Sequence, residues 1–69
     1  MRISARNVLK GKVIKIVRGA VNAEVLIQLP GGEQIVSIIT MSSVKTLGLK
    51  KGGEAYAIIK ASNVMIAVE

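Results

Sequence analysis

The chain contains no cysteine, no histidine, no tryptophan and no phenylalanine, and its single aromatic residue is Tyr56. Without cysteine or histidine it lacks the thiolate and imidazole groups that hold most zinc and copper ions in proteins. The usual catalytic groups are missing too, because the four Glu residues are scattered and no hydroxyl side chain has an evident base. We therefore predict neither an enzyme nor a site for a bare metal cation, and no cofactor.

Long apolar runs are also missing. The longest one near the end, residues 64–68, is far shorter than the roughly 20 residues of a membrane-spanning helix. The first residues contain Arg2 and Arg6 and lead into Lys10 and Lys12, so they do not form an apolar signal region. The lack of cysteine fits a reducing compartment. We predict a cytoplasmic protein with no membrane partner.

Acidic residues are few, and none occurs early in the chain. Residues 1–23 carry six cations and no acid, whereas residues 24–69 carry four of each. The whole net charge of +6 therefore lies in the first third. Such a field favours an anionic partner, either a small anion or a nucleic acid, and does not choose between them.

Five segments have the pattern of β-strands, separated by turns. The predicted strands are residues 9–17, 21–29, 33–40, 55–60 and 64–68. In the first strand the apolar phase shifts at Val13 and Ile14, which together with Gly11 predicts a bend or bulge. The sequence Pro30-Gly31-Gly32 predicts a turn, because proline fixes φ and glycine accepts a positive φ. The strands on either side of it should therefore pair antiparallel.

One short helix is predicted among the strands, over residues 40–48. Thr40 is its expected N-cap, Met41, Val44 and Leu47 share one face, and Gly48 ends it. Five antiparallel strands with a helix after the third is the element order of an OB-fold. We predict an all-β fold, a five-stranded OB-fold-like barrel with one short helix between strands three and four, as a single domain over residues 1–69.

Several of these strands are apolar on both faces. In the third strand Ile35 and Ile39 lie on one face, and Val36 and Ile38 lie on the other. A small barrel has one interior, so the second face would form an exposed apolar patch larger than monomers usually carry. Burial between subunits removes that patch and stabilises a chain of only 69 residues. We predict a homo-oligomer.

Two polar segments suit a small oxyanion. Ser4-Ala5-Arg6-Asn7 and Lys60-Ala61-Ser62 combine cations, hydroxyl groups and small residues that leave main-chain N–H groups accessible. Lys60 is the one charge between Ala55 and Val68, a placement that is costly unless an anion meets it. The alternative for the first segment is a polar entry to a strand with Arg6 in solvent, and the residues by themselves favour that alternative.

An ordered set of segments, running from Ser4 to about Val68, resembles the molbindin (Mop) family of small molybdate- and tungstate-binding proteins. The segments are Ser4–Asn7, Leu9–Val13, Val21–Val25, Ser37–Thr40 and Tyr56–Met65. The resemblance implies an intracellular store or buffer of molybdate or tungstate, assembled as a hexamer, a trimer of dimers, with oxyanions held at subunit junctions.

The resemblance also implies roles for individual residues. The side chains of Ser4, Arg6 and Lys60 would contact the anion, and Ala5, Ala61 and Ser62 would add main-chain N–H or hydroxyl donors. Thr40 is a weaker candidate, since capping the helix explains it equally well. A second oxyanion site near a symmetry axis would involve Gly19, Val21 and Asn22, which otherwise form an ordinary hairpin turn.

A nucleic-acid-binding OB-fold that uses the basic first third is the alternative function. OB-folds that bind single strands stack bases on aromatic rings, and each stacked base contributes roughly 1–3 kcal/mol. This chain offers Tyr56 alone. The prediction therefore favours a small oxyanion over a nucleic acid.

Overall fold

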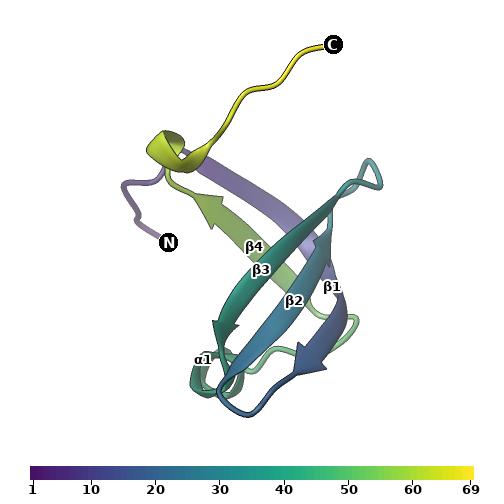
Figure 1. Ribbon diagram of the computed structural model, residues 1–69. Coiled ribbons are helices and arrows are strands. Elements are labelled where there is room, and N and C mark those ends of the chain that lie inside the picture. Colours follow the sequence, from purple (N-terminus) through teal and green to yellow (C-terminus); the bar gives the residue numbers. More distant parts are fainter.

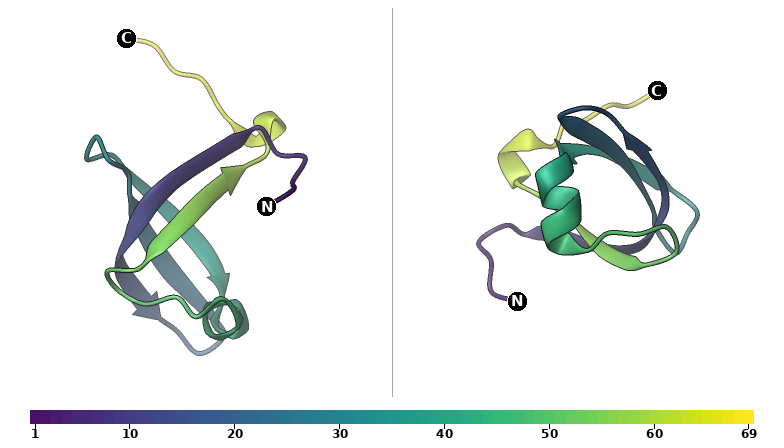
Figure 2. Two further views of the ribbon diagram at one scale, coloured as in Figure 1. Left: turned by 180° about the vertical axis from the view of Figure 1, so that it is seen from behind. Right: turned by 90° about the horizontal axis from the view of Figure 1, so that it is seen from below.

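Four β-strands and one short helix make up the ordered elements of the chain (Figure 1). The computed structural model describes all residues 1–69. The elements are β1 (Asn7–Arg18), β2 (Asn22–Gln28), β3 (Gln34–Thr40), α1 (Met41–Leu47), β4 (Glu54–Ile59) and the 3-10 turn η1 (Ala61–Asn63). The strands form one antiparallel sheet in the order β3-β2-β1-β4. The sheet curves into an incomplete ring, and α1 crosses one end of it (Figure 2).

The predicted fifth strand, residues 64–68, is wrong. After η1 this segment leaves the sheet (Figure 1), and Met65 and Val68 are 93% and 92% exposed. Its alternating, β-branched composition is typical of a strand, but a strand needs a hydrogen-bonded neighbour, and within one chain this segment has none. The fold is therefore an open, four-stranded half-barrel with one short helix instead of the predicted five-stranded barrel.

The predicted bulge in β1 is confirmed. Val13 pairs with Ile27 and Lys15 pairs with Leu26, so Ile14 is an extra residue on β1. Because of this extra residue, both Val13 and Ile16 can pack toward the core. Gly11 has a different explanation, since a Cβ there would lie 2.6 Å from the carbonyl oxygen of Gln28. It permits a close approach of β1 to β2.

The turn and the helix also match their sequence signals. Gly32 has φ +97, and its N–H donates to the carbonyl of Leu29 at 2.9 Å. Thr40 is the N-cap of α1, where its hydroxyl oxygen accepts from the Ser43 N–H at 3.0 Å. Gly48 ends the helix with φ 64, in the left-handed region that favours glycine.

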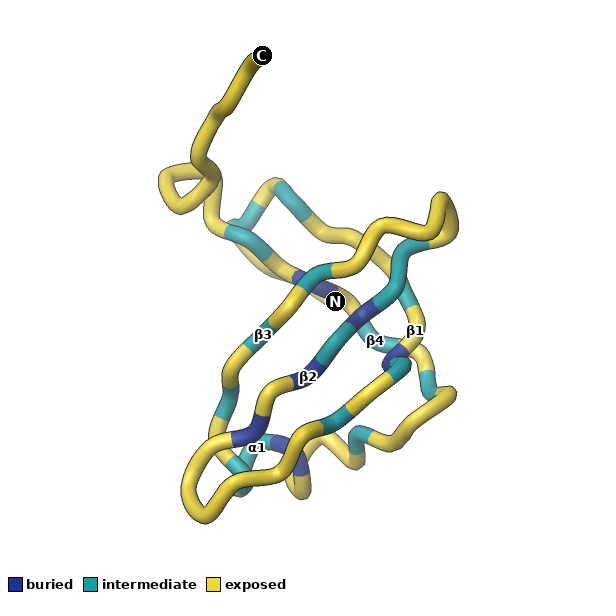
Figure 3. The backbone as a smooth tube through the Cα atoms, turned by 45° about the vertical axis from the view of Figure 1, so that its right-hand side comes forward, coloured by how far each residue is buried: buried dark blue, intermediate teal, exposed yellow.

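The core of the chain is small. Its six buried residues are Val13, Ala23, Val25, Ile27, Val44 and Ala57. Fifteen large apolar side chains are exposed, among them Val36, Ile38, Tyr56 and Ile58 on the two edge strands. Three of the buried positions lie along β2 and the others lie on β1, α1 and β4, while the C-terminal segment is exposed throughout (Figure 3). A core of this size gives little stability by itself.

Candidate functional site

The pairing of β1 with β4 brings the two predicted site segments together. Asn7, the first residue of β1, is paired with Ile59, the last residue of β4. Ser4–Arg6 directly precede this pair, and Lys60–Ser62 directly follow it. Extending the antiparallel register by one step would place Arg6 opposite Lys60. Two segments more than fifty residues apart therefore meet at one end of the half-barrel.

Asn7 holds the two site segments together at this end of the half-barrel. Its side-chain Nδ2 donates a hydrogen bond to the carbonyl oxygen of Ile59 at 3.1 Å, and the residue is half-buried. The bond ties the start of β1 to the end of β4, immediately beside both site segments. This positioning role was not among the predicted ones. The sequence signal for it was the place of Asn7 directly after Ser4-Ala5-Arg6.

A hollow of about 650 Å³ lies between the two segments. All six residues predicted from them line it, and three that the sequence prediction missed join them. The lining residues are Ser4, Ala5, Arg6, Lys60, Ala61 and Ser62, together with Ile3, Ile58 and Asn63. Below, "the hollow" means this set. The two isoleucines give it an apolar side, which no polar motif could have indicated.

Most hydrogen-bond donors in the hollow have no protein partner. The main-chain N–H groups of Ser4, Ala5 and Arg6 donate to no backbone carbonyl, and neither do those of Ala61 and Ser62. The two serine hydroxyls make no side-chain hydrogen bond. Arg6 and Lys60 form no ion pair, because the molecule's one ion pair joins Lys10 and Glu54. The hollow therefore combines two cations with several free neutral donors, a set that matches an oxyanion.

Both cations are exposed in the single chain, and Ala5 alone among the six predicted residues is half-buried. Sequence reasoning expected Lys60 in a partly desolvated pocket because of its apolar neighbours. In one chain that expectation is not met. Removing the hollow from water would require a second copy to cover it.

Comparison with known proteins identifies the family. The TOBE domain family matches residues 3–66. A probable molybdenum-pterin-binding protein of Haemophilus influenzae is 55% identical over 69 residues, the full length of both chains. MopII from Clostridium pasteurianum superposes with a TM-score of 0.92 at 49% identity, covering 97% of this chain and 100% of MopII. A molybdate-binding protein from Sporomusa ovata superposes with a TM-score of 0.92 at 35% identity, covering 99% of this chain and 100% of its own.

The chain belongs to the TOBE domain family, as a molbindin. The resemblance predicted from its motif segments is confirmed.

Thr40 lies at the other end of this molbindin chain. It is paired with Asn22 at the end of β3, whereas the hollow lies at the start of β1. The 12 residues of β1 separate the two ends by up to roughly 36 Å along the strand. The Thr40 hydroxyl also donates to Ser43 Oγ at 2.9 Å, in addition to capping α1. Within one chain, Thr40 and Lys60 therefore lie next to opposite ends of β1.

The predicted second site, Gly19, Val21 and Asn22, forms the turn between β1 and β2 at that same end. The N–H of Gly19 donates to the carbonyl of Asn22 at 2.9 Å, and the Val21 carbonyl accepts from Met41 at 2.8 Å. The Asn22 side chain makes no hydrogen bond. The turn is thus a hairpin held by its own backbone, with one polar side chain free.

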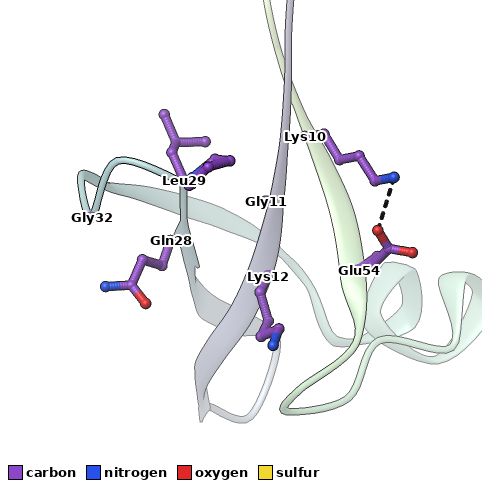
Figure 4. A pocket seen from close by; sticks show the side chains of 8 residues that line it. Lys10, Gly11, Lys12, Gln28, Leu29, Gly32 and Glu54 are labelled. Carbon is purple, nitrogen blue, oxygen red and sulfur yellow. Dashed lines mark ion pairs between the residues drawn. The ribbon is translucent and has the colours of Figure 1, made fainter.

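A second hollow, of about 460 Å³, lies on the outer face of β1 (Figure 4). Here Lys10 and Glu54 point toward each other, with Nζ and Oε2 2.9 Å apart, while Gln28 lies on the other side of the β1 ribbon. The hydrogen bond and the charge of Glu54 raise the pKa of Lys10 above its ordinary value of 10.5. Glu54 compensates Lys10 and leaves Lys12 as the one unpaired cation, so this hollow suits an anion less well than the one between the two site segments, which has two.

No group of three His, Cys, Asp or Glu side chains is placed to hold a metal ion. No helix is long and apolar enough to cross a membrane.

Proposed function

We propose that this molbindin binds molybdate or tungstate in the hollow and stores or buffers it in the cytoplasm without transforming it. The single observation that carries the proposal is the convergence of two distant segments on one hollow. Its two cations, its two serine hydroxyls and the main-chain N–H groups of Ser4–Arg6, Ala61 and Ser62 pair with no other protein group. A tetrahedral dianion needs one or two cations and several neutral donors, and the hollow supplies both.

The named relatives support the same ligand. One is described as a molybdenum-pterin-binding protein and another as a molybdate-binding protein, and both match this chain over nearly its whole length. We assign Ser4, Ala5, Arg6, Lys60, Ala61 and Ser62 to the anion and leave Thr40 as a helix cap. A second anion at Gly19, Val21 and Asn22 is a further part of the proposal, and other copies of the chain would have to complete it.

We further propose that the working form is an oligomer, a hexamer built as a trimer of dimers, with the hollow at a subunit junction. Two observations support this assembly: fifteen large apolar side chains are exposed in the single chain, and both cations of the hollow are open to solvent. Covering the hollow would strengthen the attraction between cation and anion, because the effective dielectric constant falls. In the empty assembly the cations would repel each other, and the anion would relieve that repulsion.

Calorimetric titration tests the proposal. Molybdate, tungstate, sulfate and phosphate are titrated in turn into the protein at fixed ionic strength. We expect molybdate or tungstate to bind much more tightly than sulfate and phosphate, because cavity size selects among anions that charge alone treats alike. Equally weak binding of all four would contradict a built site and leave only the general field of a basic protein.

A fifth titration, with a single-stranded oligonucleotide, addresses the alternative function. We expect no tight binding, since Tyr56 is the one aromatic ring available for stacking. Tight binding that weakens steeply with salt would favour the nucleic-acid-binding module instead.

A further inference from the structure

Four lysines lie around the bulge of β1, and the oxyanion hollow uses none of them. Lys12 and Lys15 flank the bulge. Lys50 and Lys51 belong to the turn that precedes β4. We call these four residues the basic patch. All four side chains are exposed, and none takes part in a hydrogen bond or in the molecule's one ion pair. Four of the chain's ten cations are thus without a carboxylate partner.

Backbone hydrogen bonds hold the two segments of the basic patch together. The Val13 N–H donates to the Gly53 carbonyl at 2.9 Å, and the Gly52 N–H donates to the Val13 carbonyl at 2.7 Å. The turn is closed by a bond from the Gly53 N–H to the Lys50 carbonyl at 3.0 Å, and Gly52 has φ 89, as the third residue of a type II turn requires. Val13 is completely buried, so the bulge and the turn are both anchored to the core. The lysines are therefore attached to a fixed backbone.

The basic patch is separate from the oxyanion hollow. Lys15 lies eight residues after Asn7, which is up to roughly 27 Å along the strand. Exposed charges more than about 8 Å apart are largely screened at physiological ionic strength. Lys15, Lys50 and Lys51 line no hollow of the molecule. Cations spread over an open surface suit a large partner rather than a small enclosed anion.

The chemistry at the edge of the patch favours carboxylates as its partners. Glu54 is paired with Lys12 in the sheet, and its carboxylate contacts Lys10 at 2.9 Å (Figure 4). A lysine ammonium is a point charge, without the planar fork that arginine presents to phosphate. The one aromatic ring, Tyr56, is paired with Lys10, so Glu54 lies between it and the patch along β4. A nucleic acid that reached from the patch to this ring would meet a repelling carboxylate.

A second copy of the chain does not supply the matching acidic surface. Its four acids are dispersed, and the nearest two in the sequence, Glu24 and Glu33, are nine residues apart. We infer that the basic patch docks a different protein through a segment rich in Asp and Glu. Closely spaced carboxylates would meet lysines of both segments, which speeds association and fixes orientation more than it raises affinity. The docking needs no bound oxyanion, so it is independent of the proposed function.

Fluorescence anisotropy tests the docking, with a labelled peptide of alternating glutamate and serine as the probe. The protein is free of molybdate, and the ionic strength is held fixed. The double variant Lys15→Gln with Lys51→Gln removes one charge from each segment of the patch. The matched control, Arg2→Gln with Lys45→Gln, removes the same two charges from exposed positions outside the patch. A third protein, Lys15→Arg with Lys51→Arg, keeps both charges in place.

We expect the glutamine variant of the patch to weaken peptide binding by about tenfold and the control by less than about twofold, because only the first loses close charge pairs. The arginine variant should bind as the parent protein does. Equal losses in the patch variant and the control would overturn the inference, since the peptide would then respond to net charge alone. Tighter, patch-dependent binding of a single-stranded oligonucleotide of equal charge would overturn it in favour of a nucleic acid.

An amide NMR titration of the parent protein with the same peptide gives a second readout that needs no variant. We expect the largest shifts at residues 12–15 and 50–53, where the two segments of the patch are joined. Shifts confined to Ser4–Arg6 and Lys60–Ser62 would place the peptide at the oxyanion hollow and overturn the docking. Molybdate titrations are run separately, so failure of the ligand proposal leaves this result unaffected.

Discussion

The two ends of β1 contain similar residue types but use them differently. At its end near Arg18, Thr40 and the Gly19 N–H are hydrogen-bonded within the protein, because Thr40 caps α1 and the Gly19 N–H donates to the Asn22 carbonyl, and the Asn22 side chain stays free. At its start, the donors of Ser4–Arg6 and Ala61–Ser62 pair with nothing in the chain. Small polar residues and turns occur at both ends.

The comparison shows which feature distinguishes a binding end from a structural end. Residue type does not, because hydroxyl groups and amides occur at both. The distinction is whether neighbouring backbone groups already satisfy the polar atoms, since unsatisfied donors stay available to a ligand. Cations add to this at the start of β1, where Arg6 and Lys60 line the same hollow.

The largest expected effect is on molybdate affinity, and it distinguishes a local contact with Lys60 from the general electrostatic field of a basic protein. Lys60→Ala should weaken molybdate binding by about 3 kcal/mol or more if the assembly covers the hollow, because the anion then loses one partner of a desolvated charge pair. Lys51→Ala removes the same charge from an exposed turn and should change affinity little. Isothermal titration of both variants measures the difference. Equal small losses would mean that no local site exists at Lys60.

A smaller effect on stability and affinity is expected at Asn7, which holds the two segments of the hollow together. Asn7→Ala removes the hydrogen bond to the Ile59 carbonyl and should cost about 1 kcal/mol of stability, because one half-buried bond is lost. Molybdate affinity should also fall, since the two segments of the hollow are no longer tied together. Asn22→Ala is the matched control at the other end, where the side-chain amide makes no hydrogen bond. Thermal melts with and without molybdate compare them. If Asn22→Ala reduced affinity as much, Asn7 would have no special positioning role.

Thr40→Ala should affect stability alone. Loss of the N-cap of α1 is expected to cost about 1 kcal/mol, and Thr40→Ser should restore most of it because a hydroxyl group is retained. Chemical denaturation measures the stability, and titration measures the number and affinity of bound anions. We expect the anion parameters to stay unchanged. A loss of bound molybdate in Thr40→Ala would instead bring Thr40 into a site shared between subunits.

The smallest effect is expected on the melting temperature, when the ion pair between Lys10 and Glu54 is removed. Glu54 raises the pKa of Lys10, so the ion pair stabilises the fold below pH 10.5 and this contribution disappears as pH rises through the raised pKa. Both side chains are largely exposed, at 58% and 69%, so Glu54→Gln should barely lower the melting temperature at pH 7. The difference from the parent protein should vanish once the pH exceeds the raised pKa of Lys10. A difference that persisted at that pH would point to packing rather than charge.

Much of the fold could be predicted because the signals are local. The bulge at Ile14 followed from a shift of apolar phase, and the turn at Gly32 and the end of α1 at Gly48 followed from residues that accept a positive φ. These features depend on the residue and its immediate neighbours. The prediction of a fifth strand was wrong for the opposite reason. Residues 64–68 have strand composition, but pairing depends on a neighbour that composition does not specify.

The residues of the candidate site likewise divide into those that local sequence signals predicted and those that depend on distant neighbours. The motif segments identified Ser4–Arg6 and Lys60–Ser62, and the positions of their cations and hydroxyl groups were readable from the chain. The role of Asn7 in holding the two segments together was not predicted, since its hydrogen-bond partner is a backbone carbonyl 52 residues away in the sequence. Ile3, Ile58 and Asn63 were missed because an apolar or amide side chain acquires a role in a hollow only from its surroundings.

By itself, the sequence determined the chemistry that the protein can use: cations, hydroxyl groups and N–H donors, with no thiolate, imidazole or stacking platform. It also determined the local turns, the helix cap and the family. The tertiary structure alone decided which donors remain free and which distant segments meet, because both depend on the register of β1 with β4. It likewise decided that the barrel stays open in one chain, since closing it requires a strand that the chain's own geometry directs away.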